Sequence, residues 1–157
     1  MFSIIACIGK NREIGKGKKL VFNIKDDMKF FRETTLEHTV VMGYNTWLSL
    51  PGKLKKRQNF VVSHEDVLEA DQTITDVDGF IAEHQNTDEE IFIIGGGMIY
   101  TKFLPYAKYL YLTEVDATVP DATIFFPKFD KRKYTKTLIR KGEDHDLVYS
   151  INKYTIK

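Results

Sequence analysis

Short apolar or alternating runs recur along the whole chain and predict the strands of a β-sheet. Most are rich in β-branched or aromatic residues, and glycine, proline or charged residues bound them, as is typical of strands. The runs span Phe2–Ile8, Thr39–Met42, Asn59–Val62, Ile91–Ile94, Tyr109–Val115, Tyr134–Ile139 and Val148–Ile156.

Four segments between these runs have the periodicity of short amphipathic helices. They span Lys25–Thr35, Asn45–Leu50, Asp76–His84 and Met98–Leu104. Because strands and helices alternate, the pattern predicts an α/β domain with a mostly parallel central sheet flanked by helices. Only the segment RKGEDHD separates the last two runs, which predicts an antiparallel C-terminal hairpin.

Length and charge narrow the function classes. A chain of 157 residues fits one domain, residues 1–157, with a full hydrophobic core. The 23 Lys and Arg residues nearly balance the 22 Asp and Glu residues, whereas a nucleic-acid binder is usually distinctly basic.

Composition also bears on location and metal binding. The single cysteine favours a reducing compartment, and the four scattered histidines lack the spacing of metal ligands. The N-terminal apolar run is too short for a membrane span and has no basic leader. We expect a cytoplasmic protein that binds no metal, no nucleic acid and no membrane.

A run of three glycines, Gly95–Gly97, separates a predicted strand from a predicted helix. This arrangement directs backbone N–H groups at an anion, although a tight turn that needs positive φ is the simpler explanation of the glycines taken alone. Gly43 also follows a strand and precedes a helix. Ligands of parallel sheets bind beyond the carboxyl ends of the strands, where both glycine positions lie.

A carboxylate lies among apolar residues on one predicted helical face, formed by Ile24, Asp27, Met28 and Phe31. If this face packs inward, an unpaired Asp27 costs several kcal/mol, so it needs a partner or a ligand. A half-exposed first-turn position favoured by the helix dipole is the alternative. Asp26 lies about 100° further round the helix, where we expect it to remain solvated as a cap.

A planar ligand with two adjacent N–H donors suits a carboxylate in this setting. The edge of a 2-amino-pyrimidinone has that geometry, and each charge-assisted hydrogen bond contributes roughly 1.5–3 kcal/mol.

The chain resembles the dihydrofolate reductase family from end to end. The segments SIIACIGKNREIG, VVMGYNTWLSL, IIGGGMIY and LYLTEVDA, the Asn23, Asp27 and Phe31 spacing, and Arg57 occur in the family's order. The resemblance implies a fold of about eight strands with an antiparallel end. It implies reduction of 7,8-dihydrofolate to tetrahydrofolate by NADPH, in one-carbon metabolism, by a monomer that antifolate inhibitors also bind.

The resemblance also implies the substrate site. Asp27 binds the pterin head, Thr113 bonds to Asp27, and Arg57 grips the substrate's α-carboxylate. The Ile5 and Ile94 carbonyls receive the pterin amino group. The remaining substrate-binding residues implied are Cys7, Met28, Phe31, Leu50 and Leu54, and the catalytic set is Asp27, Leu20, Phe22, Thr113 and Tyr100.

For NADPH, the resemblance implies a cis peptide at Gly95-Gly96 and a Gly15–Leu20 loop that closes over the nicotinamide. The implied cofactor-binding residues are Cys7, Ile14, Gly15, Gly43, Tyr44, Asn45, Thr46, Ser63, His64, Gly95, Gly96, Gly97, Met98, Ile99 and Tyr100. No side chain is expected to reach pterin N5, so water delivers its proton.

Two stretches depart from the family pattern. The family usually has Pro-Trp before Asn23, where this chain has Val21-Phe22, and phenylalanine offers no hydrogen-bond donor to an ordered water. Tyr44 replaces the usual arginine for the 2′-phosphate of NADPH, and Met98 occupies another position that is often basic. We therefore expect weaker discrimination against NADH.

Two other functions fit the same fold. One is the pyrimidine reductase of riboflavin synthesis, and the other is a catalytically silent nucleotide-binding module. The presence of Asp27, Thr113 and Arg57 together argues against the silent module.

Overall fold

The computed structural model describes all residues, 1–157. Its strands are β1 (Phe2–Ile8), β2 (Glu13–Lys16), β3 (Lys19–Leu20), β4 (Thr39–Gly43), β5 (Gln58–Val62), β6 (Gln72–Ile74), β7 (Ile91–Gly95), β8 (Ala107–Val115), β9 (Ile124–Phe125), β10 (Tyr134–Asp144) and β11 (Leu147–Ile156). Its helices are α1 (Lys25–Thr35), α2 (Tyr44–Ser49), α3 (Val77–His84) and α4 (Gly97–Phe103), with the 3₁₀ turns η1 (Leu104–Tyr106) and η2 (Lys131–Lys133).

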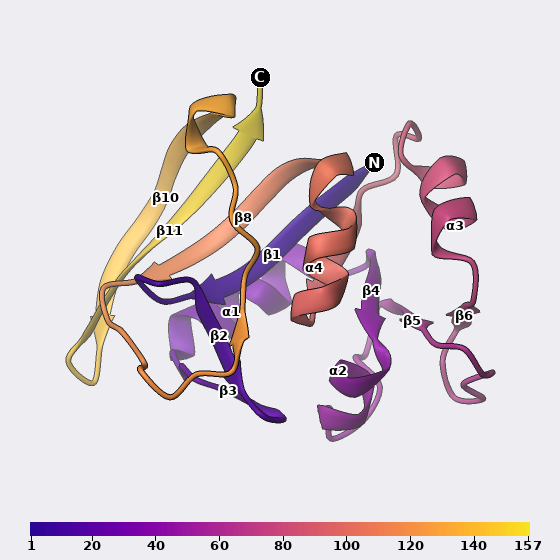
Figure 1. Ribbon diagram of the computed structural model, residues 1–157, viewed down its shortest axis with the longest axis horizontal. Helices are drawn as coiled ribbons and strands as arrows, with labels where there is room; N and C mark the ends of the chain where they lie inside the picture. Colours follow the sequence, from indigo (N-terminus) through magenta and orange to yellow (C-terminus); the bar gives the residue numbers. More distant parts are fainter.

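The central sheet has eight strands in the order β10-β11-β8-β1-β7-β4-β5-β6 (Figure 1). The pairs from β8 through β6 are parallel, and β11 pairs antiparallel with both β8 and β10. The predicted α/β class, the mostly parallel sheet and the C-terminal hairpin are therefore confirmed. The longest helix, α1, has 11 residues, and no helix has the length and hydropathy of a membrane span.

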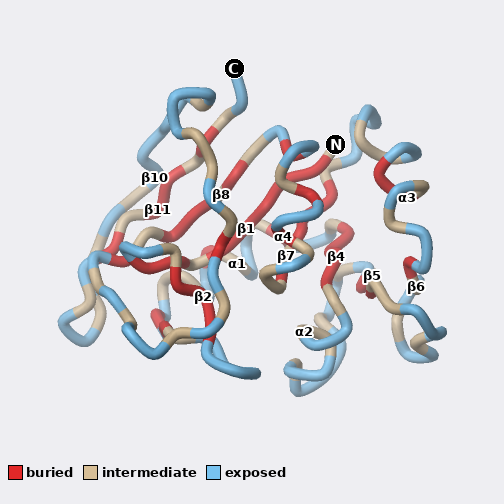
Figure 2. The backbone as a smooth tube through the Cα atoms, viewed as in Figure 1, coloured by how far each residue is buried: buried red, intermediate tan, exposed pale blue.

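The central strands separate two hydrophobic core groups, as the alternation of side chains along β1 illustrates. Ile4 packs with residues of α3 and α4 on one face, and Ile5 packs with Phe30 of α1 on the other. The buried positions concentrate in the middle strands of the sheet, and exposed positions lie at its periphery (Figure 2). Burial on both faces explains why these strands read as continuous apolar runs.

The expected Gly15–Leu20 loop is in fact part of a small second sheet, β3-β2-β9. Gly15 pairs with Leu20 and Lys16 with Lys19, so the segment is a hairpin. Thr123 fastens it from both sides, because its N–H donates to the Gly15 carbonyl at 2.9 Å and its hydroxyl accepts from the Gly17 N–H at 2.9 Å. Strands this short and charged carry too few residues to show a period, so the sequence pattern missed them.

The β10–β11 hairpin holds the N-terminal end of α1. Asp144 accepts a hydrogen bond from the Lys25 N–H at 2.9 Å and acts as a cap, since the preceding Ile24 side chain cannot. Arg140 donates to both carboxylate oxygens of Asp26, at 2.6 and 3.1 Å, and Tyr149 donates to one of them at 2.9 Å. The expectation that Asp26 stays solvated as a cap is therefore wrong.

Candidate active site

Asp27 lies in the first turn of α1, opposite the carboxyl ends of β1 and β8. The hydroxyl of Thr113 donates to Asp27 Oδ1 at 2.7 Å, which is the hydrogen bond expected from the sequence. Thr113 is the register partner of Cys7 in the parallel β1–β8 pair. Strand pairing therefore brings residues far apart in the sequence to one carboxylate.

The two consecutive carboxylates of α1 have opposite electrostatic environments. Burial raises the pKa of Asp27, and the neighbouring Asp26 charge raises it further, against the hydrogen bond from Thr113. Hydrogen bonds from Arg140 and Tyr149 lower the pKa of Asp26. Neighbouring groups whose pKa values are pushed apart mark functional sites, and here Asp27 is the perturbed acid.

Cys7 borders the Asp27 carboxylate but is not a nucleophile. Burial raises the pKa of its thiol, and the negative charge of Asp27 raises it further. A thiol kept protonated is unreactive, because the thiolate is the nucleophilic form. Cys7 therefore lies beside Asp27 as a protonated, half-buried side chain that packs against the core group containing Phe30.

The predicted face of Ile24, Asp27, Met28 and Phe31 is only partly buried. Ile24 is buried, Phe31 is half-buried, and Met28 is 51% exposed. Phe30, not Phe31, is the α1 side chain that packs fully against the sheet, with its ring 6.2 Å from that of Tyr111. The stripe with Asp27 thus lies at the border of the core, where a ligand can cover it.

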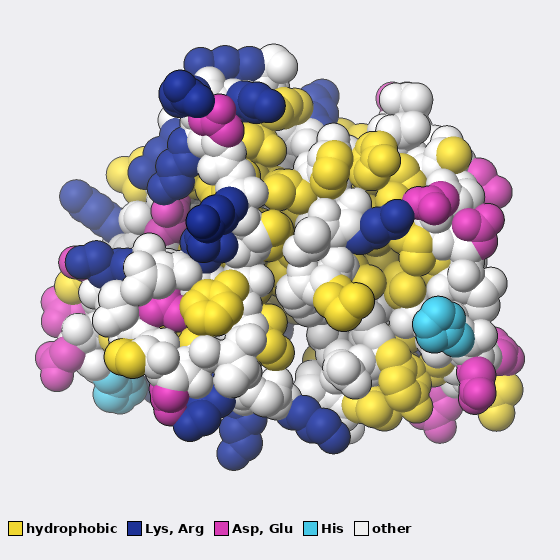
Figure 3. Space-filling model, in the orientation of Figure 1, with side chains coloured by type: hydrophobic (Ala, Val, Ile, Leu, Met, Phe, Trp, Pro, Cys, Tyr) yellow, Lys and Arg dark blue, Asp and Glu magenta, His cyan; other side chains and the backbone are white.

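Other half-buried apolar side chains adjoin this stripe. Phe31, Leu50, Leu54 and Ile94 pack against the core group that contains Phe30, yet each stays partly open. The space-filling view shows a notch between the region of β2–β3 and the region of α2 (Figure 3). An apolar border around one carboxylate suits a flat ligand with a polar edge.

Arg57 is held in place by three acceptors that leave part of its guanidinium free. Nε donates to the Thr35 hydroxyl at 2.9 Å, Nη1 to the Lys55 carbonyl at 2.8 Å and Nη2 to the Arg32 carbonyl at 3.0 Å. Since arginine has five N–H donors, one remains on each terminal nitrogen. Arg57 also borders a polar hollow of about 530 Å³. This oriented fork suits a bidentate carboxylate.

The glycine positions bring two helix starts to neighbouring strand ends. β4 and β7 pair side by side, with Met42 opposite Gly95, and α2 and α4 begin directly after them. The caps Gly43 and Gly96 provide no side-chain hydrogen bond, so the first N–H groups of both helices lack a side-chain cap. The two starts together can hold a diphosphate.

The peptide bond between Gly95 and Gly96 is cis, as the resemblance implies. Gly95 has φ of +126°, so the alternative interpretation, a turn that needs positive φ, is also correct for this residue. Tyr100 follows on α4 and donates from its hydroxyl to the Ile5 carbonyl at 2.8 Å. Tyr100 therefore links α4 to β1 at the Ile5 carbonyl, which the resemblance assigns to the pterin amino group.

The hairpin residues near this site differ widely in exposure. Leu20 is 75% exposed, whereas Ile14 is 7% exposed and its carbonyl accepts from the Val21 N–H at 3.0 Å. Phe22 is buried in the same core group as Phe30. Leu20 is therefore exposed enough to contact a bound ligand, whereas Phe22 packs in the core beneath the apolar border of the site.

The residues expected to select the cofactor lie on the surface. Tyr44 is 46% exposed and Met98 is 87% exposed. Ser63 and Thr46 are half-buried, Ile99 is half-buried, and Asn45 and His64 are exposed. None of these side chains provides a permanent positive charge for a 2′-phosphate.

Several residues that shape the site were missed from the sequence. Glu13 is 1% exposed, and its carboxylate accepts from the Val119 N–H at 2.6 Å and the Asn11 N–H at 2.7 Å. It thereby fixes the base of the β2–β3 hairpin. Arg140 and Tyr149, which bind Asp26 of α1, could not be recognised from the sequence pattern either, because Asp26 lies more than a hundred residues away in the sequence.

Known proteins match this chain over nearly its whole length. Residues 1–156 match the sequence model of the Dihydrofolate reductase family. A dihydrofolate reductase of Buchnera aphidicola subsp. Schizaphis graminum is 35% identical over 145 residues, which are 92% of this chain and 89% of the relative. The Bacillus subtilis dihydrofolate reductase is 32% identical over 144 residues, 90% of this chain and 84% of the relative.

The fold also matches a solved structure. A dihydrofolate reductase from Enterococcus faecalis, complexed with NADP(H) and RAB-propyl, superposes with a TM-score of 0.88 at 22% identity and covers 100% of this chain and 96% of that chain. The chain therefore belongs to the dihydrofolate reductase family, and its reaction is the reduction of dihydrofolate to tetrahydrofolate by NADPH.

Proposed function

We propose that Asp27 is the residue on which this reaction depends. Its carboxylate accepts hydrogen bonds from the 2-amino and N3 groups of the pterin, and the Ile5 and Ile94 carbonyls accept from the pterin amino group of substrate or antifolate. The raised pKa of Asp27 supports this role, because two hydrogen bonds donated by a ligand would offset the free-energy cost of burying the negative charge. Thr113 keeps Oδ1 oriented.

The same carboxylate assists protonation of the substrate without touching the reacting atom. A negative charge in a site of low dielectric raises the basicity of a heterocycle bound to it. Water delivers the proton to N5, and closure of the β2–β3 hairpin with Leu20 over the bound ligands would limit further access of water. Asp27 thus acts through its field and by positioning.

The cofactor fits the two uncapped helix starts. Gly43, Thr46, Gly96 and Gly97 would hold its diphosphate, and Tyr100 would lie beside the nicotinamide. A β-carbon on Gly96 would meet the Thr46 hydroxyl at 3.6 Å, so a side chain there would occupy the space between the two helix starts. When bound, NADPH supplies the hydride, whereas the chain supplies position and electrostatic field.

Arg57 would bind the α-carboxylate of the substrate's glutamate. Its two free donors, one on each terminal nitrogen, match the two oxygens of a carboxylate. The half-buried Phe31, Leu50 and Leu54 would contact the benzoyl ring between the pterin and this carboxylate. Met28 is open enough to close over the ring when it binds.

The single observation that carries these assignments is the hydrogen bond between the half-buried Asp27 and the buried Thr113. Loss of NADPH absorbance with dihydrofolate tests it, in the wild type and in Asp27→Asn. We expect Asp27→Asn to reduce kcat/KM at neutral pH by roughly 10²–10³-fold, since removing one charge-stabilising group typically costs that much. Activity should recover at acid pH, where dihydrofolate is already protonated.

The outcomes separate the alternatives. An unchanged pH–rate profile in Asp27→Asn would remove Asp27 from its role. Oxidation of NADPH with a ribosylamino-pyrimidine but not with dihydrofolate would indicate the riboflavin-pathway reductase. Binding of NADPH without turnover of either substrate would indicate a silent module.

We further propose that the chain is one domain that acts as a monomer in the cytoplasm. The single cysteine supports a reducing compartment, since it allows no intrachain disulfide. Light scattering after size exclusion measures the oligomeric state, and a mass of twice 18.2 kDa would contradict the monomer.

A further inference from the structure

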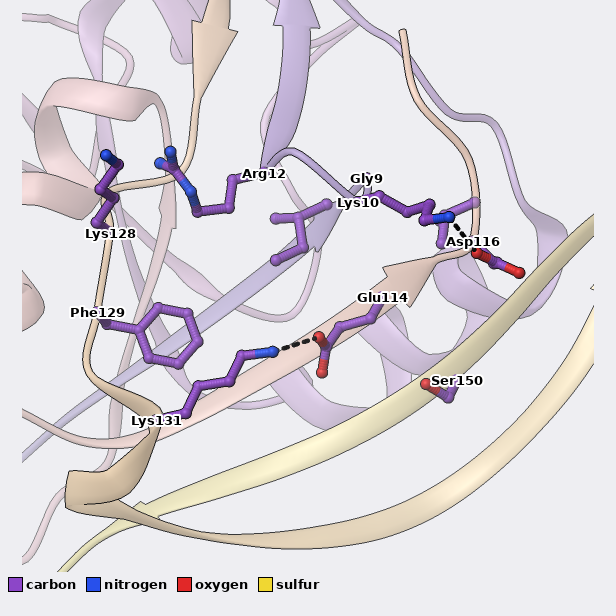
Figure 4. A pocket seen from close by; sticks show the side chains of 11 residues that line it. Gly9, Lys10, Arg12, Glu114, Asp116, Lys128, Phe129, Lys131 and Ser150 are labelled. Atoms are coloured by element: carbon purple, nitrogen blue, oxygen red, sulfur yellow. Dashed lines mark hydrogen bonds and ion pairs between the residues drawn. The ribbon is translucent and has the colours of Figure 1, made fainter.

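A second polar hollow, of about 500 Å³, lies at the carboxyl ends of β1 and β8. Of its three apolar lining residues, Ile8 and Phe129 belong to the core group on the α4 face and Val115 to the group on the α1 face, but no residue assigned above to folate or NADPH lines it. Its charged side chains come from the turn after β1, the end of β8 and the segment before β10 (Figure 4). This hollow is therefore separate from the folate and NADPH site.

The hollow has an excess of positive charge. Four cationic side chains line it, Lys10, Arg12, Lys128 and Lys131, against two carboxylates, Glu114 and Asp116. Lys10 pairs with Asp116 at 3.3 Å, and Lys131 pairs with Glu114 at 3.5 Å. Two positive charges thus remain without an ion-pair partner among the lining residues, and the buried Glu13 carboxylate beside Arg12 offsets only part of one of them.

The carboxylate of Glu114 cannot supply further compensation. It already accepts hydrogen bonds from Asn152 Nδ2 at 3.0 Å and from the Tyr154 hydroxyl at 2.5 Å. Its pairing with Lys131 is therefore shared with two other donors, and it has little capacity for a second cation.

Arg12 and Lys128 are the uncompensated pair. Neither makes an ion pair with a carboxylate, and their charged groups lie on the same side of the hollow (Figure 4). Arg12 Nη1 donates to the Phe126 carbonyl at 2.6 Å, which fixes the guanidinium beside the segment that carries Lys128. Four of its five N–H donors remain available.

We propose that this hollow binds a small dianion of the phosphate class, either inorganic phosphate or a phosphate monoester. The Arg12 fork matches two oxygens of a tetrahedral anion, and Lys128 adds a point charge. Two uncompensated positive charges match a doubly charged anion. A monocarboxylate would leave one of them unmatched.

Such a ligand would act at the base of the β2–β3 hairpin. The Phe126 N–H donates to the Arg12 carbonyl at 2.8 Å, and β2 pairs with β9 through Glu13 and Phe125. An anion held by Arg12 and Lys128 would tighten this junction. Binding there should therefore raise the thermal stability of the protein.

Titration of ¹⁵N-labelled protein with sodium phosphate tests the proposal, at constant ionic strength with NADPH saturating the cofactor site. We expect saturable shifts at the amides of residues 9–12 and 128–131, together with a rise in Tm that chloride does not reproduce. Arg12→Gln and Lys128→Gln should each weaken binding by about tenfold, as expected for a lost charge-assisted contact. Phenyl phosphate in place of phosphate distinguishes an ester from the inorganic ion.

Lys133→Gln is the matched control, because it removes one charge from the same basic segment without lining the hollow. It should leave phosphate binding unchanged. Equal weakening in this control, or shifts that grow without saturation across the surface, would overturn the proposal. Two independent variants ensure that misfolding of one leaves the test valid.

Discussion

Asp26 and Asp27 are adjacent in sequence, yet one is fastened by an arginine and the other is sheltered beside a threonine. The chemical difference follows from direction alone. One carboxylate points to the β10–β11 hairpin and the other to the ends of β1 and β8. The helical period suggested which of the two faces the ligand. It could not reveal Arg140, because no local pattern links residue 26 to residue 140.

The raised pKa of Asp27 predicts a stability cost for the functional charge. The folded state holds the Asp27 proton to a higher pH than the unfolded state, where the pKa is about 4. The free energy of unfolding therefore falls as the pH rises from that value through the folded pKa. The free energy of unfolding of Asp27→Asn should equal that of the wild type below this pH range and should exceed it at pH 7. Asparagine carries no buried charge and still accepts the Thr113 hydrogen bond.

Urea denaturation at acid and neutral pH measures this difference. Asp26→Asn is the matched control with the opposite sign, since the pKa of Asp26 is lowered and its charge stabilises the fold at neutral pH. An Asp27→Asn protein less stable than the wild type at neutral pH would contradict the assigned burial cost.

Tyr44 predicts the cofactor preference of this chain. Because no cation stands at this position, we expect the 2′-phosphate to add little to the affinity for NADPH over that for NADH. Tyr44→Arg should raise the ratio of kcat/KM for NADPH over NADH by about tenfold or more, the value of one charge-assisted contact. Tyr44→Phe is the control and should leave the ratio unchanged. A thousandfold preference for NADPH in the wild type would show that other residues provide the selection.

Among the helices, α1 depends most visibly on a distant element. Its first turn is capped by Asp144 and paired through Asp26 with Arg140, both from β10. These contacts fix the position of α1 relative to the sheet, and with it the position of Asp27 relative to Thr113. The C-terminal hairpin therefore positions the catalytic helix although it carries none of the expected substrate residues.

Arg140→Gln should remove this support. The two side chains are 39% and 28% exposed, so we expect a loss of about 1 kcal/mol after solvent screening, near the upper end for a surface pair. Because the pKa of Asp26 is lowered in the folded state, its stabilisation is present above about pH 4 and is lost as the pH falls through the folded pKa. The difference between variant and wild type should therefore shrink in acid.

Urea denaturation measures this loss too, with Lys141→Gln as the control, since Lys141 is exposed and forms no ion pair. An equal loss in both variants would indicate a general charge effect. If α1 moves relative to the sheet when Arg140 is replaced, kcat should fall in Arg140→Gln and stay unchanged in Lys141→Gln.

The strands and helices that build the core were predictable because each buries an apolar face. β1 and α1 have the predicted bounds, and the other long elements differ by a few residues at their ends. The elements that escaped prediction are β2, β3, β6 and β9, which have two to four residues each. Pairing with a neighbouring strand, not their own periodicity, defines them.

For the whole molecule, the two core groups share the strands of one sheet, which predicts a single cooperative unfolding transition. Trp47 is the only tryptophan and lies on α2, near the β6 edge, so its fluorescence reports the region opposite the C-terminal hairpin. Fluorescence and far-UV circular dichroism should give coincident denaturation curves. Two separated transitions would contradict the proposal of one domain.

The central place of β1 has a consequence for synthesis on the ribosome. β1 is synthesised before the other strands of the sheet. Its neighbours, Ile91–Ile93 of β7 and the residues of β8, are synthesised much later, and only the β10–β11 hairpin of the central sheet follows them. At ~5–20 residues per second, the nascent chain carries this apolar stretch without its partners for on the order of ten seconds. We therefore expect the apolar side chains of β1 to stay without their partners on the nascent chain until β7 and β8 have emerged.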